Sequence, residues 1–151
     1  MIKIVTAAQM RAIDRECTRL GTPTSLLMEN AGRAVAEETR DYLGNIKKQH
    51  VLCLIGAGNN GGDGLVAARY LREWGAKISI YLCSARPADD ANLQLVREGG
   101  ITCSEASADK NLKKLDGLLA STTCVIDALL GTGKMRPLEG VFQKTLEKVN
   151  A

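Results

Sequence analysis

The segment that most constrains the fold is a glycine-rich stretch, residues 56–64 (Gly-Ala-Gly-Asn-Asn-Gly-Gly-Asp-Gly), which directly follows five apolar residues at 51–55. A short, continuous apolar run is typical of a strand that is covered on both faces, as in a parallel sheet. Helical periodicity follows over residues 65–74 and ends at Gly75. Strand, glycine-rich turn and helix in this order predict an α/β fold.

The same alternation continues to the end of the sequence. Apolar segments at 78–83, 101–104 and 124–127 are expected to be further strands, and residues 90–98, 112–119 and 138–149 are expected to be helices. Short joints and right-handed crossovers predict a Rossmann-like three-layer αβα sandwich with a mainly parallel sheet in the order 3-2-1-4. The first and fourth strands are then neighbours at the switch point, where such sheets bind ligands at their carboxyl ends.

The first part of the chain is expected to be helical. Thr6 and Gln9 form a capping box, and apolar residues then recur at helical spacing up to a break at residues 21–23. Ser25 is expected to cap a second helix that ends near Gly44. We therefore expect a single domain over residues 1–151, with a helical part at about 6–44 and an alternating part at about 50–150.

Composition excludes several classes of function. The net charge of +3 and five aromatic residues in 151 do not favour a nucleic-acid partner. No apolar run approaches the ~20 residues of a membrane span, and the start of the chain lacks a signal-peptide pattern. The cysteines show no metal-binding spacing, so we expect reduced, structural thiols and a cytoplasmic location. They are Cys17, Cys53, Cys83, Cys103 and Cys124.

The first glycine-rich segment has the composition of a nucleotide-binding loop. It contains G-x-G-x-x-G, but residues 82–84 (Leu-Cys-Ser) replace the acid that binds a ribose in ordinary dinucleotide folds. Amides at the start of the following helix can bind phosphate, and asparagine carbonyls can face a cation. The alternative is a tight turn that needs glycine, which explains one or two glycines but not Asn59, Asn60 and Asp63.

A second glycine-containing segment, residues 127–137, follows the predicted fourth strand. Asp127 stands at the carboxyl end of that strand, where it is a candidate cation ligand or acid/base group. Gly131 and Gly133 permit close approach to an anion, and Lys134 and Arg136 add positive charge. The segment does not match a Walker A loop. The alternatives are that Asp127 only caps a turn and that Lys134 is a solvated lysine.

Two further sites offer polar residues. Glu29 and Asn30 lie near the start of the predicted second helix beside Gly32, and either ligand contact or close helix packing can account for them. His50, the only histidine, precedes the first strand at the end opposite the predicted cleft, so we expect no catalytic or metal-binding role for it.

Residues 27–32, 56–69 and 127–133 together resemble the NAD(P)H-hydrate epimerase family, the YjeF N-terminal domain. The resemblance implies a Rossmann-like αβα fold and interconversion of the R and S forms of hydrated NADH and NADPH (NADHX and NADPHX). An S-specific dehydratase, in some relatives fused downstream, would then restore the cofactor. Family members continue beyond the last helix with another strand and an Asp-x-Pro-Ser-Gly-like turn. We therefore expect a C-terminally truncated domain that lacks the last strands and has weakened activity.

The resemblance also assigns residues to the site. Nucleotide contacts are expected from two segments, Asn59, Asn60, Gly61, Gly62 and Asp63 in the first and Gly131, Thr132, Gly133, Lys134, Met135, Arg136 and Pro137 in the second. Asn60 and Asp127 would be ligands of a potassium ion. Asp127 and Asp63 are the loop carboxylates available for acid/base catalysis. A homodimer is also expected.

Two other functions remain open from the sequence. Relatives of this domain occur in scaffolds, so the chain could be a non-catalytic nucleotide-sensing or scaffold module. The polar residues of the Asn-Asn-Gly-Gly-Asp segment argue against that function, because a scaffold does not need them. An NAD-dependent dehydrogenase would need the missing ribose acid and a substrate domain.

Overall fold

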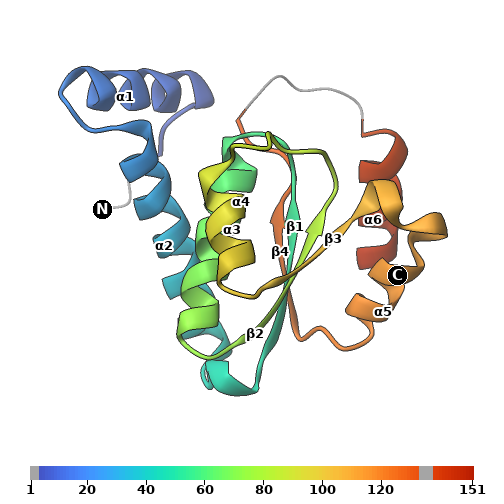
Figure 1. Ribbon diagram of the computed structural model, residues 1–151. Helices are drawn as coiled ribbons and strands as arrows, with labels where there is room; N and C mark the ends of the chain where they lie inside the picture. The colour runs from blue at the N-terminus through green and yellow to red at the C-terminus, as the bar shows by residue number, and fades with distance from the viewer. Residues whose placement is uncertain (1–3, 133–137) are drawn as a thin grey trace.

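The computed structural model describes residues 4–132 and 138–151, in which strands and helices alternate along most of the chain (Figure 1). The strands are β1 (His50–Ile55), β2 (Lys77–Leu82), β3 (Thr102–Glu105) and β4 (Cys124–Ala128). The α-helices are α1 (Ala7–Arg19), α2 (Thr24–Leu43), α3 (Asn59–Glu73), α4 (Ala91–Glu98), α5 (Lys113–Leu119) and α6 (Gly140–Val149). The described residues also form the short 3₁₀ turns η1 (Ile46–Lys48), η2 (Ala106–Ala108) and η3 (Lys110–Leu112).

The described strands form one parallel sheet in the order β3-β2-β1-β4, which confirms the predicted fold class and strand order. Cys53 in the middle of β1 pairs with Ile80 of β2 on one side and with Ile126 of β4 on the other. β1 is completely buried, as its continuous apolar run predicts. The carboxyl ends of β1 and β4 therefore lie side by side.

Helices cover both faces of the sheet (Figure 1). On one face, α3 and α4 pack on alternate residues of β1 and β2, and α2 packs on α3; the central residues of this core are Val51, Cys53, Ile55, Leu65, Leu71, Ile78, Ile80 and Val96. On the other face, α5 and α6 cover a smaller core of Leu52, Leu54, Tyr81, Cys83, Leu115 and Leu129. This layering is the predicted αβα sandwich.

The N-terminal helix α1 lies at one end of the molecule beside the start of α2 (Figure 1). Its capping box is present as predicted, with the Gln9 amide donating to Thr6 Oγ1 over 3.2 Å and the Thr6 amide donating to Gln9 Oε1 over 2.8 Å. No residue of α1 is buried, and Met10 and Ile13 are each more than 40% exposed. Its apolar periodicity therefore predicts the helix correctly but not its packing.

Two local predictions are wrong. α3 begins at Asn59, six residues before the expected start at 65, so most of the glycine-rich segment is the first turns of a helix and not a loop. Close packing against neighbouring segments holds these residues in helical form despite the low helix propensity of glycine. The cap of α2 is Pro23, and Ser25 lies inside the helix.

His50 lies at the amino end of β1, away from both glycine-rich segments. Its ring atoms Nε2 and Nδ1 lie 2.9 Å from Ser79 Oγ and 3.0 Å from the Ser121 carbonyl oxygen, and the residue is buried. These contacts link β1 to β2 and to the turn before β4, so His50 serves the packing of the sheet.

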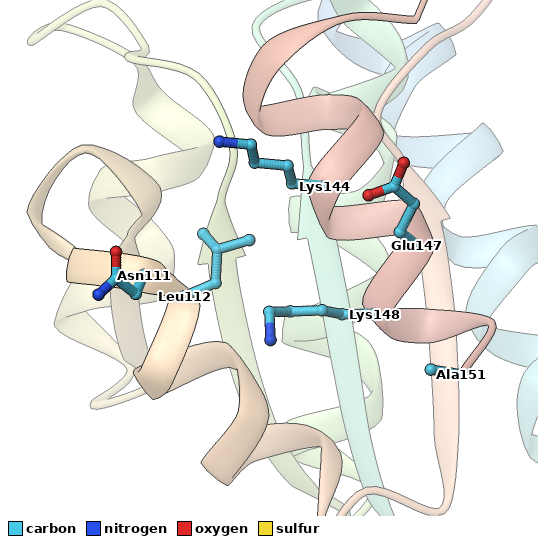
Figure 2. Close-up of a pocket in the computed structure, with 6 residues that line it drawn as sticks. All are labelled: Asn111, Leu112, Lys144, Glu147, Lys148 and Ala151. Carbon is cyan, nitrogen blue, oxygen red and sulfur yellow. The ribbon is translucent and has the colours of Figure 1, made fainter.

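A cavity of about 440 Å³ lies between η3 and α6, at the opposite side of the sheet from α3 (Figure 2). It is lined by Asn111, Leu112, Lys144, Glu147, Lys148 and Ala151. Asn111 and Leu112 both have positive φ angles, of 58° and 56°. None of the predicted site residues that the structure describes lines this cavity. None of the helices in the described part of the chain is long and apolar enough to cross a membrane.

Candidate functional site

The two glycine-rich segments meet at the carboxyl ends of β1 and β4, as predicted. The Gly56 amide donates to the Ala128 carbonyl over 3.1 Å, and a Cβ at Gly56 would overlap the carbonyl oxygen of Leu129. Glycine at position 56 therefore allows the two segments to touch.

The side chain of Asn60 makes a second link between the segments. Its amide nitrogen Nδ2 donates to the Leu130 carbonyl oxygen over 3.0 Å. Gly131 lies next to Asn60, since a Cβ at Gly131 would be 3.1 Å from Asn60 Cβ. With Nδ2 engaged, the carbonyl oxygen of the Asn60 side chain is the atom that can face a ligand.

The first turn of α3 presents backbone donors at this junction. Its N-cap, Gly58, has no side chain to satisfy the first amides of the helix, and Asn59 is exposed beside it. The Gly62 amide donates back to the Gly58 carbonyl over 3.2 Å, which closes the first helical turn. Free amides at a helix N-terminus and the helix dipole together favour an anion such as a phosphate.

Glycines in the first turns of α3 are also required by neighbours in α2 and β4. A Cβ at Gly62 would lie 2.5 Å from Met28 Sδ in α2, and one at Gly64 would lie 2.6 Å from Ala128 Cβ. The predicted structural alternative accounts for one or two glycines, and the structure extends it, because close packing explains Gly56, Gly61, Gly62 and Gly64 alike. It leaves Asn59 and Asp63 unexplained.

Asp63 lies in the same turn and is half-buried. Burial, and secondarily the negative charge of Asp14 in α1, raises the pKa of Asp63 to about 6. A carboxyl group with a pKa near neutrality can both donate and accept a proton under physiological conditions. A role for Asp63 as a general acid/base group stays a prediction.

Asp127 is exposed at the end of β4. Its Oδ1 accepts a hydrogen bond from the Leu129 amide over 2.9 Å. The alternative that Asp127 caps a turn is therefore confirmed for this oxygen. The capped turn leads to Leu130, whose carbonyl oxygen contacts Asn60. A role as a cation ligand through its second oxygen stays a prediction.

Glu29 and Gly32 serve the packing of α2 on α3. Both oxygens of Glu29 accept from Arg69 Nη2, at 2.7 and 2.5 Å, and Oε1 also accepts from the Tyr70 hydroxyl at 2.7 Å. Burial favours the neutral acid, but the hydrogen bonds from Tyr70 and Arg69 outweigh it and lower the pKa of Glu29. A Cβ at Gly32 would overlap Val66. Of the two interpretations of this segment, close packing is the one that the geometry supports.

Three polar residues near the site were not predicted from the sequence. Arg11 of α1 donates to the Thr132 carbonyl over 2.7 Å, and Asp14 lies one turn further along the same helix, near enough to Asp63 to affect its pKa. The three-residue spacing of Arg11 and Asp14 places both on one helix face, but nothing local indicates what that face meets.

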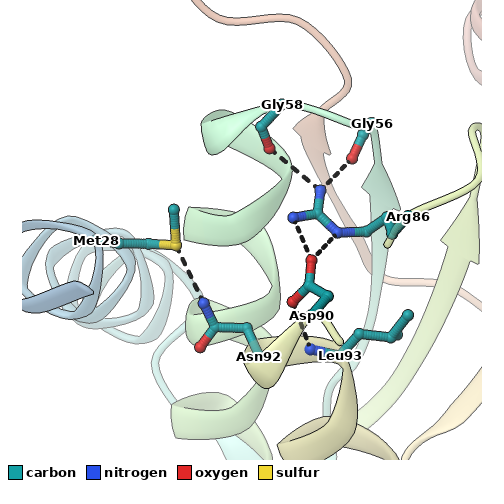
Figure 3. Close-up of polar contacts among 7 residues, drawn as sticks. All are labelled: Met28, Gly56, Gly58, Arg86, Asp90, Asn92 and Leu93. Atoms are coloured by element: carbon teal, nitrogen blue, oxygen red, sulfur yellow. Dashed lines mark hydrogen bonds and ion pairs between the residues drawn. The ribbon is translucent and has the colours of Figure 1, made fainter. Parts of the chain in front are cut away.

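The third missed residue, Arg86, follows β2 and contacts the β1–α3 loop (Figure 3). Its Nη1 donates to the carbonyl oxygens of Gly56 and Gly58, at 2.5 and 3.1 Å, and its Nε donates to Asp90 Oδ2 at 2.6 Å. The contacts of Arg86 with Gly56 and Gly58 span 30 and 28 positions, so no local pattern predicts them.

Part of the predicted site lies outside the described residues. These are Gly133, Lys134, Met135, Arg136 and Pro137. Within residues 4–132 and 138–151, no group of three His, Cys, Asp or Glu side chains is arranged to hold a metal ion. All five cysteines are free thiols, as expected, and burial raises the pKa of Cys53 to about 12.

Residues 24–151 match the family model described as YjeF-related protein N-terminus. The NAD(P)H-hydrate epimerase of Elusimicrobium minutum is 34% identical, over 99% of this chain and 70% of that protein. The bifunctional NAD(P)H-hydrate repair enzyme Nnr of Thermofilum pendens is 38% identical, over 99% of this chain but 29% of its own length. The chain thus spans less than a third of this relative. A crystal structure of the yeast protein ynu0 superimposes with a TM-score of 0.84 at 25% identity, covering 98% of this chain and 65% of that one. This chain belongs to the family of YjeF-related protein N-terminal domains.

Proposed function

We propose that this chain catalyses the interconversion of the R and S forms of hydrated NADH and NADPH. The observation that carries the proposal is the junction of the two glycine-rich segments at the ends of β1 and β4, which the Asn60–Leu130 hydrogen bond links. Relatives that are 34% and 38% identical to this chain are named NAD(P)H-hydrate epimerase and bifunctional NAD(P)H-hydrate repair enzyme. The junction lies where parallel α/β sheets bind nucleotides.

The first turn of α3 is the proposed phosphate-binding site. The backbone N–H groups at the start of this helix, where Asn59 is exposed, supply donors with the right electrostatic sign. The second segment is also proposed to contact the nucleotide, through Gly131 and Thr132 beside Asn60 and through residues 133–137, which lie outside the described residues. Together they would fix the hydrated nicotinamide ring at the junction, which brings its reacting carbon within reach of Asp63.

Asp63 is the proposed acid/base residue. In the hydrate, a hydroxyl group is bonded to the ring carbon next to the ring nitrogen. A protonated Asp63 gives its proton to this hydroxyl, water leaves, and the nitrogen lone pair forms an iminium bond to the same carbon. Water then adds to the opposite face and returns a proton to Asp63. A pKa of about 6 suits both steps, since each form of the carboxyl group is populated near neutral pH.

A potassium ion is proposed at the same junction. Asn60 offers its side-chain oxygen because its nitrogen is bonded to Leu130, and Asp127 offers the oxygen that does not cap the turn. Carboxylate and carbonyl oxygens suit potassium, so the donor set fits this ion. Bound there, the ion would supply positive charge and order the two segments. Replacing potassium with sodium or lithium at constant ionic strength tests the assignment.

The partner implied by this reaction is a dehydratase that accepts one of the two hydrates. The bifunctional relatives are named for NAD(P)H-hydrate repair, which is consistent with such a pairing on one chain. A homodimer and a cytoplasmic location stay predictions.

The proposed function is tested by following conversion of purified R hydrate to S hydrate chromatographically, at a pH where spontaneous exchange is slow. We expect conversion above the blank for the wild-type chain, and a large loss for Asp63→Asn. Asp41→Asn, at an exposed carboxylate far along α2, is the matched control and should retain the activity. Binding of the hydrate without conversion would favour a nucleotide-sensing module. If the wild-type chain neither bound nor converted the hydrate, the proposal would be refuted.

A further inference from the structure

Arg86 is a buried charge that the proposed chemistry does not use. Its side chain is 6% exposed and that of its ion-pair partner Asp90 is 10% exposed. A buried guanidinium group is costly unless its charge is paired and its N–H groups are hydrogen-bonded. Here Asp90 neutralises the charge, and the remaining donors bind the carbonyl oxygens of Gly56 and Gly58 (Figure 3).

Asp90 is itself held in place by α4. Its Oδ1 accepts from the Leu93 amide over 3.0 Å and so caps that helix, while its Oδ2 binds Arg86. The planar guanidinium group is therefore fixed by a helix terminus on one side and contacts the β1–α3 loop on the other. A rigid fork of donors fixes the directions of its acceptors more closely than a flexible ammonium group would.

The contacts of Arg86 determine which way the loop amides face. In a trans peptide unit, the carbonyl group and the following N–H group point in opposite directions. Because the carbonyls of Gly56 and Gly58 point to Arg86, the N–H groups of Ala57 and Asn59 point away from it. Ala57, Gly58 and Asn59 are all exposed, so these donors face solvent at the start of α3.

Gly61 fits the same arrangement. A Cβ at this position would lie 2.6 Å from Arg86 Nη1 and would overlap the carbonyl oxygen of Gly56. The first turn of α3 can therefore approach the arginine and the loop only because residue 61 has no side chain. Arg86, Gly56 and Gly61 form one packed unit behind the exposed amides.

We infer that Arg86 is a positioning residue that holds the β1–α3 loop with its amides directed to the phosphates of the nucleotide. The identity of the ligand in this inference rests on the proposed function, whereas the effect of Arg86 on the order of the loop does not. A loop containing Gly56 and Gly58 has wide conformational freedom. Without Arg86 the binding-competent orientation would be a minor one, and the apparent affinity would fall in proportion.

The first test measures hydrogen exchange in the ligand-free chain. The amides of Gly56 and Gly62 are hydrogen-bonded at the two ends of the loop, so their protection reports its order. We expect Arg86→Met to accelerate their exchange roughly tenfold or more, from the loss of charge-assisted hydrogen bonds. Arg97→Met, which removes a 54% exposed arginine paired to Glu105 at 3.7 Å, is the control and should leave it unchanged. Wild-type protection in Arg86→Met would overturn the inference.

Two milder variants keep the test valid if Arg86→Met does not fold. Arg86→Lys keeps the charge but cannot bind both carbonyls and Asp90 as a fork. Asp90→Asn keeps a side-chain acceptor for the cap of α4 while removing the charge that orients Arg86. Both should show faster exchange at Gly56 and Gly62 with the rest of the chain folded.

The second test measures affinity for ADP and for NADH hydrate by calorimetry, below the thermal transition of each variant. We expect Arg86→Met to weaken both about tenfold and Arg97→Met to weaken neither. A merely structural role would lower the melting temperature and leave the affinity of the folded protein unchanged, which would overturn the inference. If the wild type bound neither ligand, the proposed function would fail, and the exchange result alone would decide the role of Arg86.

Discussion

The side-chain amide of Asn60, in the first turn of α3, donates a hydrogen bond to the carbonyl oxygen of Leu130 over 3.0 Å. The two residues are seventy positions apart, and each follows one of the two neighbouring strands β1 and β4. Together with the hydrogen bond from the Gly56 amide to the Ala128 carbonyl, this contact joins the two glycine-rich segments into one site. It also orients Asn60, because the nitrogen faces the protein and the oxygen is left for a ligand.

Loss of the Asn60–Leu130 contact should loosen the junction. We expect Asn60→Ala to lower the free energy of unfolding by about 1 kcal/mol, the usual contribution of one hydrogen bond. Asn59→Ala, at the exposed neighbouring position, should change stability by less than about 0.5 kcal/mol. Urea unfolding followed by Trp74 fluorescence measures both. Equal stabilities for the two variants would show that the contact does not hold the segments together.

The raised pKa of Asp63 makes stability depend on pH. In the folded chain Asp63 holds its proton up to about pH 6, whereas an unfolded aspartate loses it near pH 4. The resulting stabilisation is present below about pH 4 and is lost as the pH rises through about 6. Asp63→Asn should therefore be more stable than wild type at pH 7, by about 1–2 kcal/mol after allowing for solvent screening.

The difference between Asp63→Asn and wild type should shrink as the pH falls below 6 and vanish near 4. Asp14→Asn should lower the pKa of Asp63, because it removes the nearby negative charge. Unfolding curves across this pH range and NMR titration of the carboxyl group test the two statements. A constant difference at all pH values would contradict the assigned pKa.

Glu29 should stabilise the chain through its contacts with α3. We expect Glu29→Gln to cost about 1 kcal/mol, since it removes the charge that binds Arg69 in a partly buried ion pair. Glu37→Gln in the same helix breaks a more exposed pair with Arg33 and should cost less than about 0.5 kcal/mol. Because the pKa of Glu29 is lowered, its contribution is present above the unfolded pKa and is lost as the pH falls through the folded value. Thermal melts at neutral and acidic pH measure this.

Gly32 should not tolerate a side chain. We expect Gly32→Ala to destabilise the fold by about 1–3 kcal/mol, because the added methyl group would overlap Val66 and the Asp63 carbonyl. Gly117→Ala in α5 is the matched control, since a Cβ there meets open space and alanine favours a helix. The control should be neutral or more stable in the same thermal melt. A neutral Gly32→Ala would mean that α2 and α3 do not pack as closely as described.

The order of the sheet could be predicted from the sequence because strands and helices alternate with short joints, although β3 (Thr102–Glu105) is a polar strand and not an apolar run. The start of α3 could not, since Asn and Gly disfavour helix and only contacts with Met28, Arg86 and Ala128 show why the first turn forms. Arg86 could not be found either, because a link between two loops is a tertiary contact. Met10 and Ile13 illustrate the same limit, since spacing predicts a helix but not what covers its apolar face.

The claim that the two segments form one nucleotide site is tested most directly by hydrogen exchange in the presence of saturating NADPH hydrate. The account predicts that peptides covering residues 56–63 and 128–132 become protected together and with the same ligand dependence. The peptide covering β3 should be unaffected, because that strand lies at the far edge of the sheet. Protection of only one segment, or of neither, would contradict the account.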